Sequence, residues 1–431
     1  MSRKEPILFK QYPNLKEKVP WIPLLANLPT PVERLTQLED YFTLNNSKIF
    51  IKRDDKNHPF YGGNKIRKFE FIFGEILRNN KKNVLTTGGI GTNHGLACAI
   101  VCHELNPPLK CHLYLYHQPL TWHVQRLLLL FDYFGAKIHL GKGDIGTFIK
   151  ALFFKAFHPK FYWIFPGGSP LFGIGSSLGT IGFVNAAYEL KQQIDQNIIP
   201  EPDVIFIAGG TVGTAAGLIA GCKMLGLKSK IHVVAVYTRL TSNSTAVKRN
   251  ANKAIKYLRK KDKSIPKIKV NKNDFVFIEG YLGSGYGIKT LKGQNAIDKV
   301  DELEGYERDF FLETTYTGKA MAAMFDYLNY EENKNKTFLF WNTYNSNDLD
   351  KYLKQTNFKY DKLPKKFHKF YEDTKFQCWQ ITDCPEDTKK SCPAFLNHEY
   401  RFWRVTECQL GEEKHNKAFE ELKNVIKLEG E

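Results

Sequence analysis

The sequence predicts an α/β protein built on parallel β-sheets and followed by a small, separate C-terminal appendage. From about residue 48 to 345, short β-branched or apolar runs alternate with longer helical stretches, and glycine or a small polar residue marks each junction. This alternation is typical of βαβ units, in which helices cover both faces of a parallel sheet. After about Asn345 the alternation stops, and the chain becomes rich in Lys, Asp and Phe. The two regions therefore differ in architecture.

The individual elements follow from these runs. At 431 residues the chain is long enough for two or three domains. The expected strands are Ile49–Lys52, Val84–Thr87, His112–Tyr116, Lys137–His139, Trp163–Phe165, Val204–Ala208, His232–Val236 and Thr337–Trp341. The clearest expected helices are Lys65–Asn79, His94–Glu104, Trp122–Phe134, Gly179–Gln192, Thr214–Leu225 and Gly318–Leu328.

Composition gives no support for a disordered chain, a collagen or a small disulfide-rich protein. The apolar and charged fractions, 42% and 25%, are ordinary for a globular chain, although the formal net charge is +17. The densest basic cluster, Lys248–Lys272, has a single Asp and one Tyr, and its pattern indicates a short helix and a Pro-bearing loop. We interpret it as a solvated insertion rather than a nucleic-acid surface, so we expect no nucleic-acid partner.

The N-terminus lacks the apolar stretch and cleavage site of a signal peptide, and no later run approaches a membrane-spanning length. We therefore expect a cytoplasmic protein with no membrane partner. In that compartment its eight cysteines favour free thiols, metal ligands or redox groups over structural disulfides.

The first motif with chemical meaning is residues 61–68 (YGGNKIRK), between a strand and a helix. Its two glycines let the backbone approach a ligand closely, and the start of the helix attracts anions. Lys65 in this place suits a phosphate-bearing aldehyde, although a surface lysine on a first helical turn would give the same pattern.

Two further glycine-rich turns each follow a strand and open a helix. Residues 86–95 (TTGGIGTNHG) offer backbone amides, a hydroxyl, an amide and an imidazole, a set that suits a carboxylate; the alternative is a tight turn with Thr92 as an N-cap. Residues 207–218 (IAGGTVGTAAGL) form a Gly/Thr loop of the kind that cradles phosphates. The third motif matches neither the P-loop nor the dinucleotide pattern, so it predicts a phosphate rather than a nucleotide.

Taken in order, these three motifs resemble those of pyridoxal-phosphate (PLP) dependent enzymes of the tryptophan synthase β-like fold (fold type II). The resemblance is to the branch of D-cysteine desulfhydrases and 1-aminocyclopropane-1-carboxylate (ACC) deaminases, and it covers roughly residues 30 to 345. Further matches are residues 52–55 (KRDD), 166–169 (PGGS), 178–184 (LGTIGFV), 286–287 (YG) and 316–321 (YTGKAM).

The resemblance implies a PLP-dependent catalytic region over residues 1–345, with two open parallel-sheet α/β domains. The smaller domain would comprise about residues 62–185, and the flanking segments would form the larger one. It also implies a small amino-acid substrate, and we expect a homodimer.

The resemblance also implies roles for single residues. Lys65 would hold PLP as a Schiff base and exchange protons with the substrate. The substrate carboxylate would meet Thr92, Asn93 and His94. Thr92 would also be a catalytic residue, and Asn93 would also bind the cofactor. Tyr286 and Tyr316 would flank the substrate as catalytic residues. The remaining cofactor ligands would be Lys68, Gly210, Thr211, Val212, Gly213, Thr214 and, on the pyridine nitrogen, Thr317.

The hydroxyl at Thr317 bears on the reaction. A neutral partner leaves the pyridine nitrogen unprotonated and weakens the cofactor as an electron sink, and ACC deaminases usually have Glu there. This favours β-elimination of a thiol or similar group from a small amino acid. ACC-like deamination, racemisation or dehydration, and a non-catalytic PLP or amino-acid sensor remain alternatives, and neither the amino acid nor its enantiomer is specified.

Three departures from the family pattern concern the site. Gly91 replaces the usual Gln, Val212 interrupts the glycines of the phosphate loop, and residues 340–345 (FWNTYN) replace a His-Thr-Gly-Gly segment. The last change lies beside the cofactor in the family, and together with the C-terminal appendage it is the basis for the sensor alternative.

The appendage, residues 346–431, contains Cys378, Cys384, Cys392 and Cys408. The run Cys-Trp, Cys-Pro, Cys-Pro-Ala-Phe resembles a short bacterial four-cysteine module. Four thiolates can hold zinc or an iron–sulfur cluster, although the spacing lacks paired Cys-x-x-Cys knuckles. The alternative is a set of unconnected thiols.

Overall fold

The computed structural model describes residues 5–43, 47–304, 309–354 and 360–372. The chain forms two compact units. The first consists of Met1–Lys82 and Tyr162–Asn347, and the second of Asn83–Phe161 and Asp348–Glu431.

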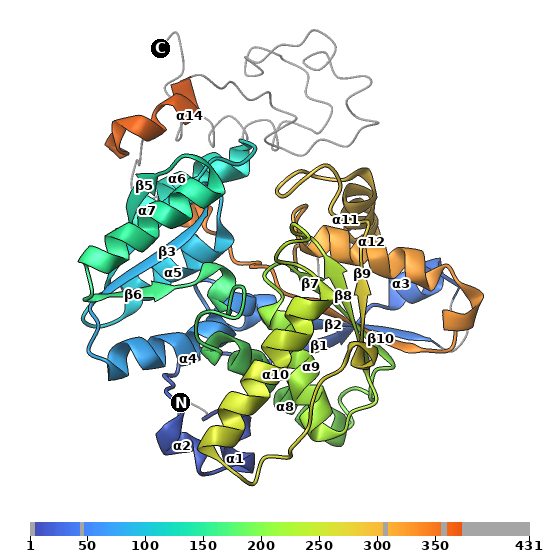
Figure 1. Ribbon diagram of the computed structural model, residues 1–431. Helices are drawn as coiled ribbons and strands as arrows, with labels where there is room; N and C mark the ends of the chain where they lie inside the picture. The colour runs from blue at the N-terminus through green and yellow to red at the C-terminus, as the bar shows by residue number, and fades with distance from the viewer. Residues whose placement is uncertain (1–4, 44–46, 305–308, 355–359, 373–431) are drawn as a thin grey trace, which may run out of the picture. The chain divides into compact units, whose positions relative to one another are not determined.

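A six-stranded sheet forms the centre of the first unit (Figure 1). Its strands, in spatial order, are β1 (Val32–Arg34), β2 (Lys48–Arg53), β10 (Thr337–Asn342), β7 (Val204–Gly209), β8 (Lys230–Ala235) and β9 (Phe275–Ile278). The short edge strand β1 is antiparallel to β2, and all other neighbours are parallel.

Helices lie on both faces of this sheet, and further helices of the unit pack on these helices. They are α1 (Ile7–Gln11), α2 (Leu15–Lys18), α3 (Thr36–Tyr41), α4 (Asn64–Arg78), α8 (Leu178–Asp195), α9 (Gly213–Leu225), α10 (Ser244–Lys261), α11 (Leu291–Glu304) and α12 (Thr317–Leu328). Alternate residues of β7 divide between the faces: Val204 and Phe206 join a buried core with α3, α11 and α12, whereas Ile205 and Ile207 are buried outside that core.

The second unit contains the four-stranded sheet β5-β4-β3-β6. Its strands are β3 (Asn83–Gly89), β4 (Lys110–Tyr116), β5 (Lys137–Leu140) and β6 (Phe161–Ile164), the last of which begins where the unit's first segment ends; β3, β4 and β5 are parallel. Its helices are α5 (Asn93–Glu104), α6 (Trp122–Tyr133), α7 (Gly143–Phe157), α13 (Asp350–Lys354) and α14 (Lys369–Glu372). The predicted α/β class with parallel sheets is therefore confirmed.

One part of the sequence prediction is wrong. The basic cluster Lys248–Lys272 is not a short helix in a solvated insertion, because α10 begins at Ser244 and continues for 18 residues. Its Val247, Ala251 and Leu258 are buried, and the helix packs against α9. The lysines occupy its other face. Their number favoured a solvated segment over a helix that is packed into the first unit.

A buried ionic network connects the start of α4 to the sheet. Glu189 lies 2.6 Å from Lys52 and 2.9 Å from Arg67, while Arg67 lies 2.6 Å from Asp54. All four side chains are at most 1% exposed. The indole of Trp341 donates to Asp54 over 2.8 Å. The network fixes β2, β10, α4 and α8 against one another.

Glu189 is the centre of that network, and its loss should destabilise the first unit strongly. Burial raises its pKa, but the charges of Arg67 and Lys52 outweigh burial and lower it overall. Removing one partner of a buried ion pair leaves the remaining charge buried without compensation, which costs about 3–5 kcal/mol of stability. We expect Glu189→Ala to lower the free energy of unfolding of the first unit by about that amount, measured by denaturant melts at pH 7.

Lys191→Ala provides a matched control on the same helix, because its pair with Asp195 is partly exposed. It should change stability by less than about 1 kcal/mol. Equal effects of the two substitutions would contradict a structural role for the network.

No helix among the described residues is long and apolar enough to cross a membrane.

Candidate active site

The turn before Lys65 requires both of its glycines. A Cβ on Gly62 would lie 1.7 Å from the carbonyl oxygen of Asp55, and Gly63 has a φ of 100°. Helix α4 begins at Asn64, directly after this turn. The geometry places Lys65 on the first turn of the helix, as the motif predicts.

Residues 340–345, which depart from the family pattern, hold this turn in place. The amide of Gly62 donates to Asn345 Oδ1 over 2.7 Å, and the amide of Asn64 donates to the carbonyl oxygen of Thr343 over 3.2 Å. A Cβ on Gly63 would come within 2.7 Å of the same carbonyl oxygen. The altered segment therefore supports the position of Lys65.

The amine of Lys65 is electrostatically unusual. Its Nζ donates to Asn64 Oδ1 over 2.8 Å. Although the residue retains some exposure, burial of the amine lowers its pKa to about 8, against an opposing effect of the Glu313 carboxylate. A lysine with a lowered pKa has a larger neutral fraction near pH 7 and is a better nucleophile for a carbonyl group.

Lys68, one turn further along α4, has a buried amine. It is 1% exposed, and its Nζ donates to the carbonyl oxygen of Gly167 over 2.9 Å and to Ser169 Oγ over 3.0 Å. Burial, and then repulsion from Lys65, hold its pKa well below the usual value. In the part of the chain that the structure describes, no carboxylate forms an ion pair with Lys68. An anion bound here would stabilise its charged form.

The third motif lies next to this amine. Helix α9 begins at Gly213, and a Cβ there would lie 1.8 Å from Ser169 Oγ and 3.5 Å from Lys68 Nζ. Val212 at the N-cap is left-handed, with a φ of 54°, a strained conformation for a β-branched residue. Thr214 Oγ1 accepts a hydrogen bond from Asn64 Nδ2 over 3.1 Å. The helix N-terminus, Lys68 and the Lys65 turn are thus adjacent.

The loop also requires small residues at two other positions. A Cβ on Gly167 would lie 2.1 Å from Thr211 Oγ1, and one on Gly210 would lie 3.1 Å from the ring of Tyr316. The Pro-Gly-Gly-Ser segment at residues 166–169 and the phosphate-type loop therefore fit closely together. The sequence predicted both segments but not their contact.

Thr317, predicted to meet a pyridine nitrogen, is buried at the start of α12. Its Oγ1 accepts from the backbone amide of Glu313 over 2.7 Å. The Glu313 carboxylate accepts from the amides of Thr315, Tyr316 and Thr317 over 2.7–2.9 Å, while burial raises its pKa. Glu313 therefore orders the turn that carries Thr317.

The two predicted catalytic tyrosines form a pair. The hydroxyls of Tyr286 and Tyr316 lie 2.6 Å apart, and the ring of Tyr237 packs edge-on against Tyr286. Burial raises the pKa of Tyr286 above its ordinary value, so its hydroxyl stays protonated at pH 7. The pair can relay a proton between its two oxygens.

The second unit contains the remaining predicted substrate residues. Thr92 is the N-cap of α5, and its Oγ1 accepts from the amide of Gly95 over 3.2 Å. Asn93 is the first residue of that helix, and His94 Nε2 lies 3.1 Å from Thr86 Oγ1. The N-cap alternative is therefore confirmed, and the carboxylate-binding role of this motif stays a prediction.

The sequence did not predict that Glu313 and Gln118 contribute to the two predicted site regions. Glu313 carries no motif of its own, and its position before the N-cap Tyr316 matches no known capping pattern. The amide of Gln118 packs on the second glycine-rich turn, where Cβ atoms on Gly89 and Gly91 would lie 2.0 and 2.7 Å from it. A Cβ at Gly91 would also lie 2.6 Å from Val124 Cγ2, so the departure at Gly91 accompanies close packing of this turn. Cys378, Cys384, Cys392 and Cys408 lie outside the described residues.

The first unit has the features that PLP requires. Lys65 provides an amine of lowered pKa for the aldehyde, and Lys68 with the start of α9 provides an anion site for the phosphate. A charged lysine that is buried without a carboxylate partner destabilises the fold unless a ligand supplies the negative charge. The residues present therefore fit PLP.

Comparisons with known proteins agree with this assignment. Residues 24–343 match the family model described as pyridoxal-phosphate dependent enzyme. A D-cysteine desulfhydrase of Klebsiella pneumoniae (strain 342) is 29% identical over 316 residues, which cover 70% of this chain and 87% of the relative.

Solved structures are also similar. One described as an ACC deaminase homologue has a TM-score of 0.64 and 25% identity, and the match covers 79% of this chain and 95% of that one. A threonine deaminase from Solanum lycopersicum, with a TM-score of 0.53, 17% identity and coverage of 82% and 94%, shares the fold. Because the family model spans well over half of the sequence, this chain belongs to the pyridoxal-phosphate dependent enzymes.

Proposed function

We propose that this enzyme is a lyase that releases a β-leaving group from a small amino acid, as its relative named D-cysteine desulfhydrase suggests. The observation that carries the reaction type is the hydroxyl of Thr317, buried at the start of α12 where a carboxylate would make a stronger electron sink. PLP, when bound, supplies the electron sink that makes the substrate Cα–H acidic. The protein selects the bond that breaks.

Each predicted residue has a role in this proposal. Lys65 holds the cofactor and exchanges the Cα proton. Lys68 and the loop Gly210, Thr211, Val212, Gly213 and Thr214 bind the phosphate. Thr317 meets the pyridine nitrogen, and Thr92, Asn93 and His94 bind the substrate carboxylate.

The tyrosine pair gives the elimination a proton source. A thiolate leaving group takes up a proton as it departs, and the hydroxyls of Tyr286 and Tyr316 carry protons that they can donate; Tyr286 is protonated at neutral pH, since burial only raises its pKa further. Their 2.6 Å separation lets one hydroxyl restore the proton of the other. With one water, D-cysteine would give pyruvate, ammonia and hydrogen sulfide.

A substrate panel tests the reaction type. We expect D-cysteine or another β-substituted amino acid to release pyruvate and ammonia in equal amounts, and ACC to be a poor substrate. Faster ammonia release from ACC would favour the second candidate, an ACC deaminase-like activity, which the similarity to the ACC deaminase homologue suggests. Full cofactor occupancy without product from any D- or L-amino acid would contradict catalysis and favour a sensor.

The lowered pKa of Lys65 predicts a specific pH dependence. Only the neutral amine attacks the cofactor aldehyde, so the rate of PLP uptake by apoenzyme should rise with pH and level off above about 8, rather than above the ordinary value of about 10.4. Because the Glu313 carboxylate raises the pKa of Lys65, Glu313→Gln should move this inflection to lower pH. Stopped-flow absorbance at several pH values measures both effects.

Glu302→Gln is the control, since Glu302 is exposed and pairs with Lys299 on α11. It should leave the profile unchanged. An inflection near pH 10, or one that Glu313→Gln does not move, would contradict this view of Lys65.

Three finer predictions belong to the same proposal: a cytoplasmic location, a homodimer, and one zinc or iron–sulfur centre held by Cys378, Cys384, Cys392 and Cys408. The exposed apolar side chains Ile145, Phe153 and Phe157 of α7 support a subunit contact, since they are 62–79% exposed. Native mass spectrometry with elemental analysis tests the last two, and a monomer without metal would contradict both.

A further inference from the structure

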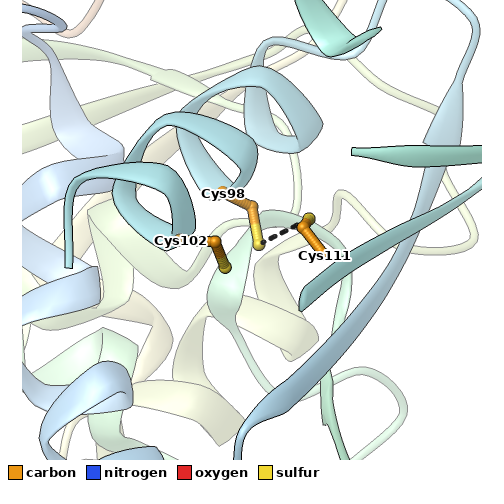
Figure 2. A group of neighbouring side chains, drawn as sticks. All are labelled: Cys98, Cys102 and Cys111. Atoms are coloured by element: carbon orange, nitrogen blue, oxygen red, sulfur yellow. Dashed lines mark hydrogen bonds between the residues drawn. The ribbon is translucent and has the colours of Figure 1, made fainter. Parts of the chain in front are cut away.

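Three cysteine thiols lie together inside the second unit (Figure 2). Cys98 and Cys102 are one helical turn apart on α5, and Cys111 extends toward them from β4. The three Sγ atoms lie within 4.8 Å of one another, and those of Cys98 and Cys111 are 3.9 Å apart. None of the three residues is more than 2% exposed. We refer to these residues as the thiol cluster.

The spacing of the sulfurs suits a single metal ion. With metal–sulfur bonds of about 2.3 Å, a planar three-sulfur site places its sulfurs roughly 4 Å apart. The sulfurs of Cys98 and Cys111 already have this spacing, and no pair in the cluster is more than 4.8 Å apart. Small shifts of three side chains would complete the coordination without rearrangement of α5 or β4.

The number and type of donors narrow the choice of metal. Among the described His, Cys, Asp and Glu side chains, the metal-capable group consists of these three thiols. Structural zinc sites take four ligands, whereas thiolates select soft cations such as copper(I). A three-sulfur donor set with no oxygen or imidazole therefore suits a soft cation that accepts three-fold coordination.

Burial of the cluster also bears on metal binding. Thiols lose their protons when they ligate a metal, and a bound cation would neutralise the thiolate charge that would otherwise be buried in the core.

We propose that Cys98, Cys102 and Cys111 form a binding site for one soft monovalent cation such as copper(I), which they would bind through three sulfur ligands. The bound ion would link α5 to β4. The alternative is that the three cysteines serve only as small apolar residues of the core. The proposal is independent of the reaction that the enzyme catalyses and of any metal at the C-terminal cysteines.

The test begins from full-length PLP-loaded protein in which Cys378, Cys384, Cys392 and Cys408 are replaced by serine. This removes the other candidate thiols and leaves the thiol cluster with Cys222, which is buried in α9 of the first unit. The protein is equilibrated without oxygen with copper(I) and the competing chelator bathocuproine disulfonate. We expect one copper(I) per chain.

Single substitutions then separate ligands from core residues. Cys102→Ser should weaken copper(I) binding by more than the roughly 10- to 100-fold that loss of an outer-shell partner costs, and Cys222→Ser should leave it unchanged. Circular dichroism and the cofactor absorbance check that each variant is folded. No copper retained against the chelator, or equal effects of the two substitutions, would overturn the proposal.

X-ray absorption on the unsubstituted cluster gives a readout that does not depend on a variant folding. Three sulfur neighbours around copper are expected. A copper shell with nitrogen or oxygen neighbours, or with fewer than three sulfurs, would also overturn the proposal.

Discussion

Lys65→Ala should abolish cofactor attachment and lower turnover of the best substrate by at least about 1,000-fold, since a positioned general base alone contributes 10²–10⁴ and the covalent link is lost as well. The expected spectrum lacks the absorbance band near the visible edge that the PLP-loaded protein shows. Kinetics with saturating PLP and the absorbance of the dialysed variant measure the two effects.

Lys56→Ala, close in sequence but on the short turn Asp54–Lys56, is the matched control. It should keep both the band and the activity. A Lys65→Ala protein that retains the band after dialysis would show that another lysine holds the cofactor.

The second large effect is expected at Lys68, where loss of the amine should weaken PLP binding without lowering the stability of the apoenzyme. Lys68 is buried, its pKa is held well below the usual value by burial and by Lys65, and it has no carboxylate partner among the described residues. A hydrogen bond to a charged group contributes about 1.5–3 kcal/mol, so Lys68→Met should raise the PLP dissociation constant roughly 10- to 100-fold.

The stability of the apoenzyme distinguishes this role from a structural one. Methionine replaces a buried amine that burial disfavours by an apolar side chain of similar volume, so the free energy of unfolding of the apo protein should not fall. If Lys68→Met destabilises the apoenzyme while PLP affinity is unchanged, Lys68 serves the fold and the phosphate site lies elsewhere. Equilibrium dialysis with PLP and denaturant melts without it provide the two measurements.

The parts of the fold that the sequence predicts are those whose local pattern agrees with their environment. Strand β7 is apolar throughout because helices cover both faces, and α9 begins where a Gly/Thr loop ends. These rules also place Lys65 at the start of α4. Family resemblance then supplied roles that spacing alone could not.

Other elements could not be read locally. Helix α7 buries only Thr147 and Ala151 and exposes several large apolar side chains, so it lacks the usual inward apolar stripe. Strand β9 is four residues long and follows a lysine-rich loop. Its place at the sheet edge depends on pairing with β8.

The same limit applies to the site. Glu313 acts by accepting hydrogen bonds from the backbone amides of a turn that exists only in the folded chain. The four-residue spacing of Cys98 and Cys102 is visible in the sequence, but the convergence of Cys111 depends on how α5 packs on β4. Contacts between distant segments decide both cases.

The most direct test of the central claim, that Lys65 holds PLP, is chemical trapping followed by peptide mapping. Borohydride reduces the link between the cofactor and its lysine to a stable secondary amine, which adds the cofactor's mass to one peptide. We predict that fragmentation of this peptide places the added mass on Lys65, in a single copy per chain. Modification of Lys68 or of another lysine in its place, or no modification of a fully PLP-loaded protein, would contradict the account.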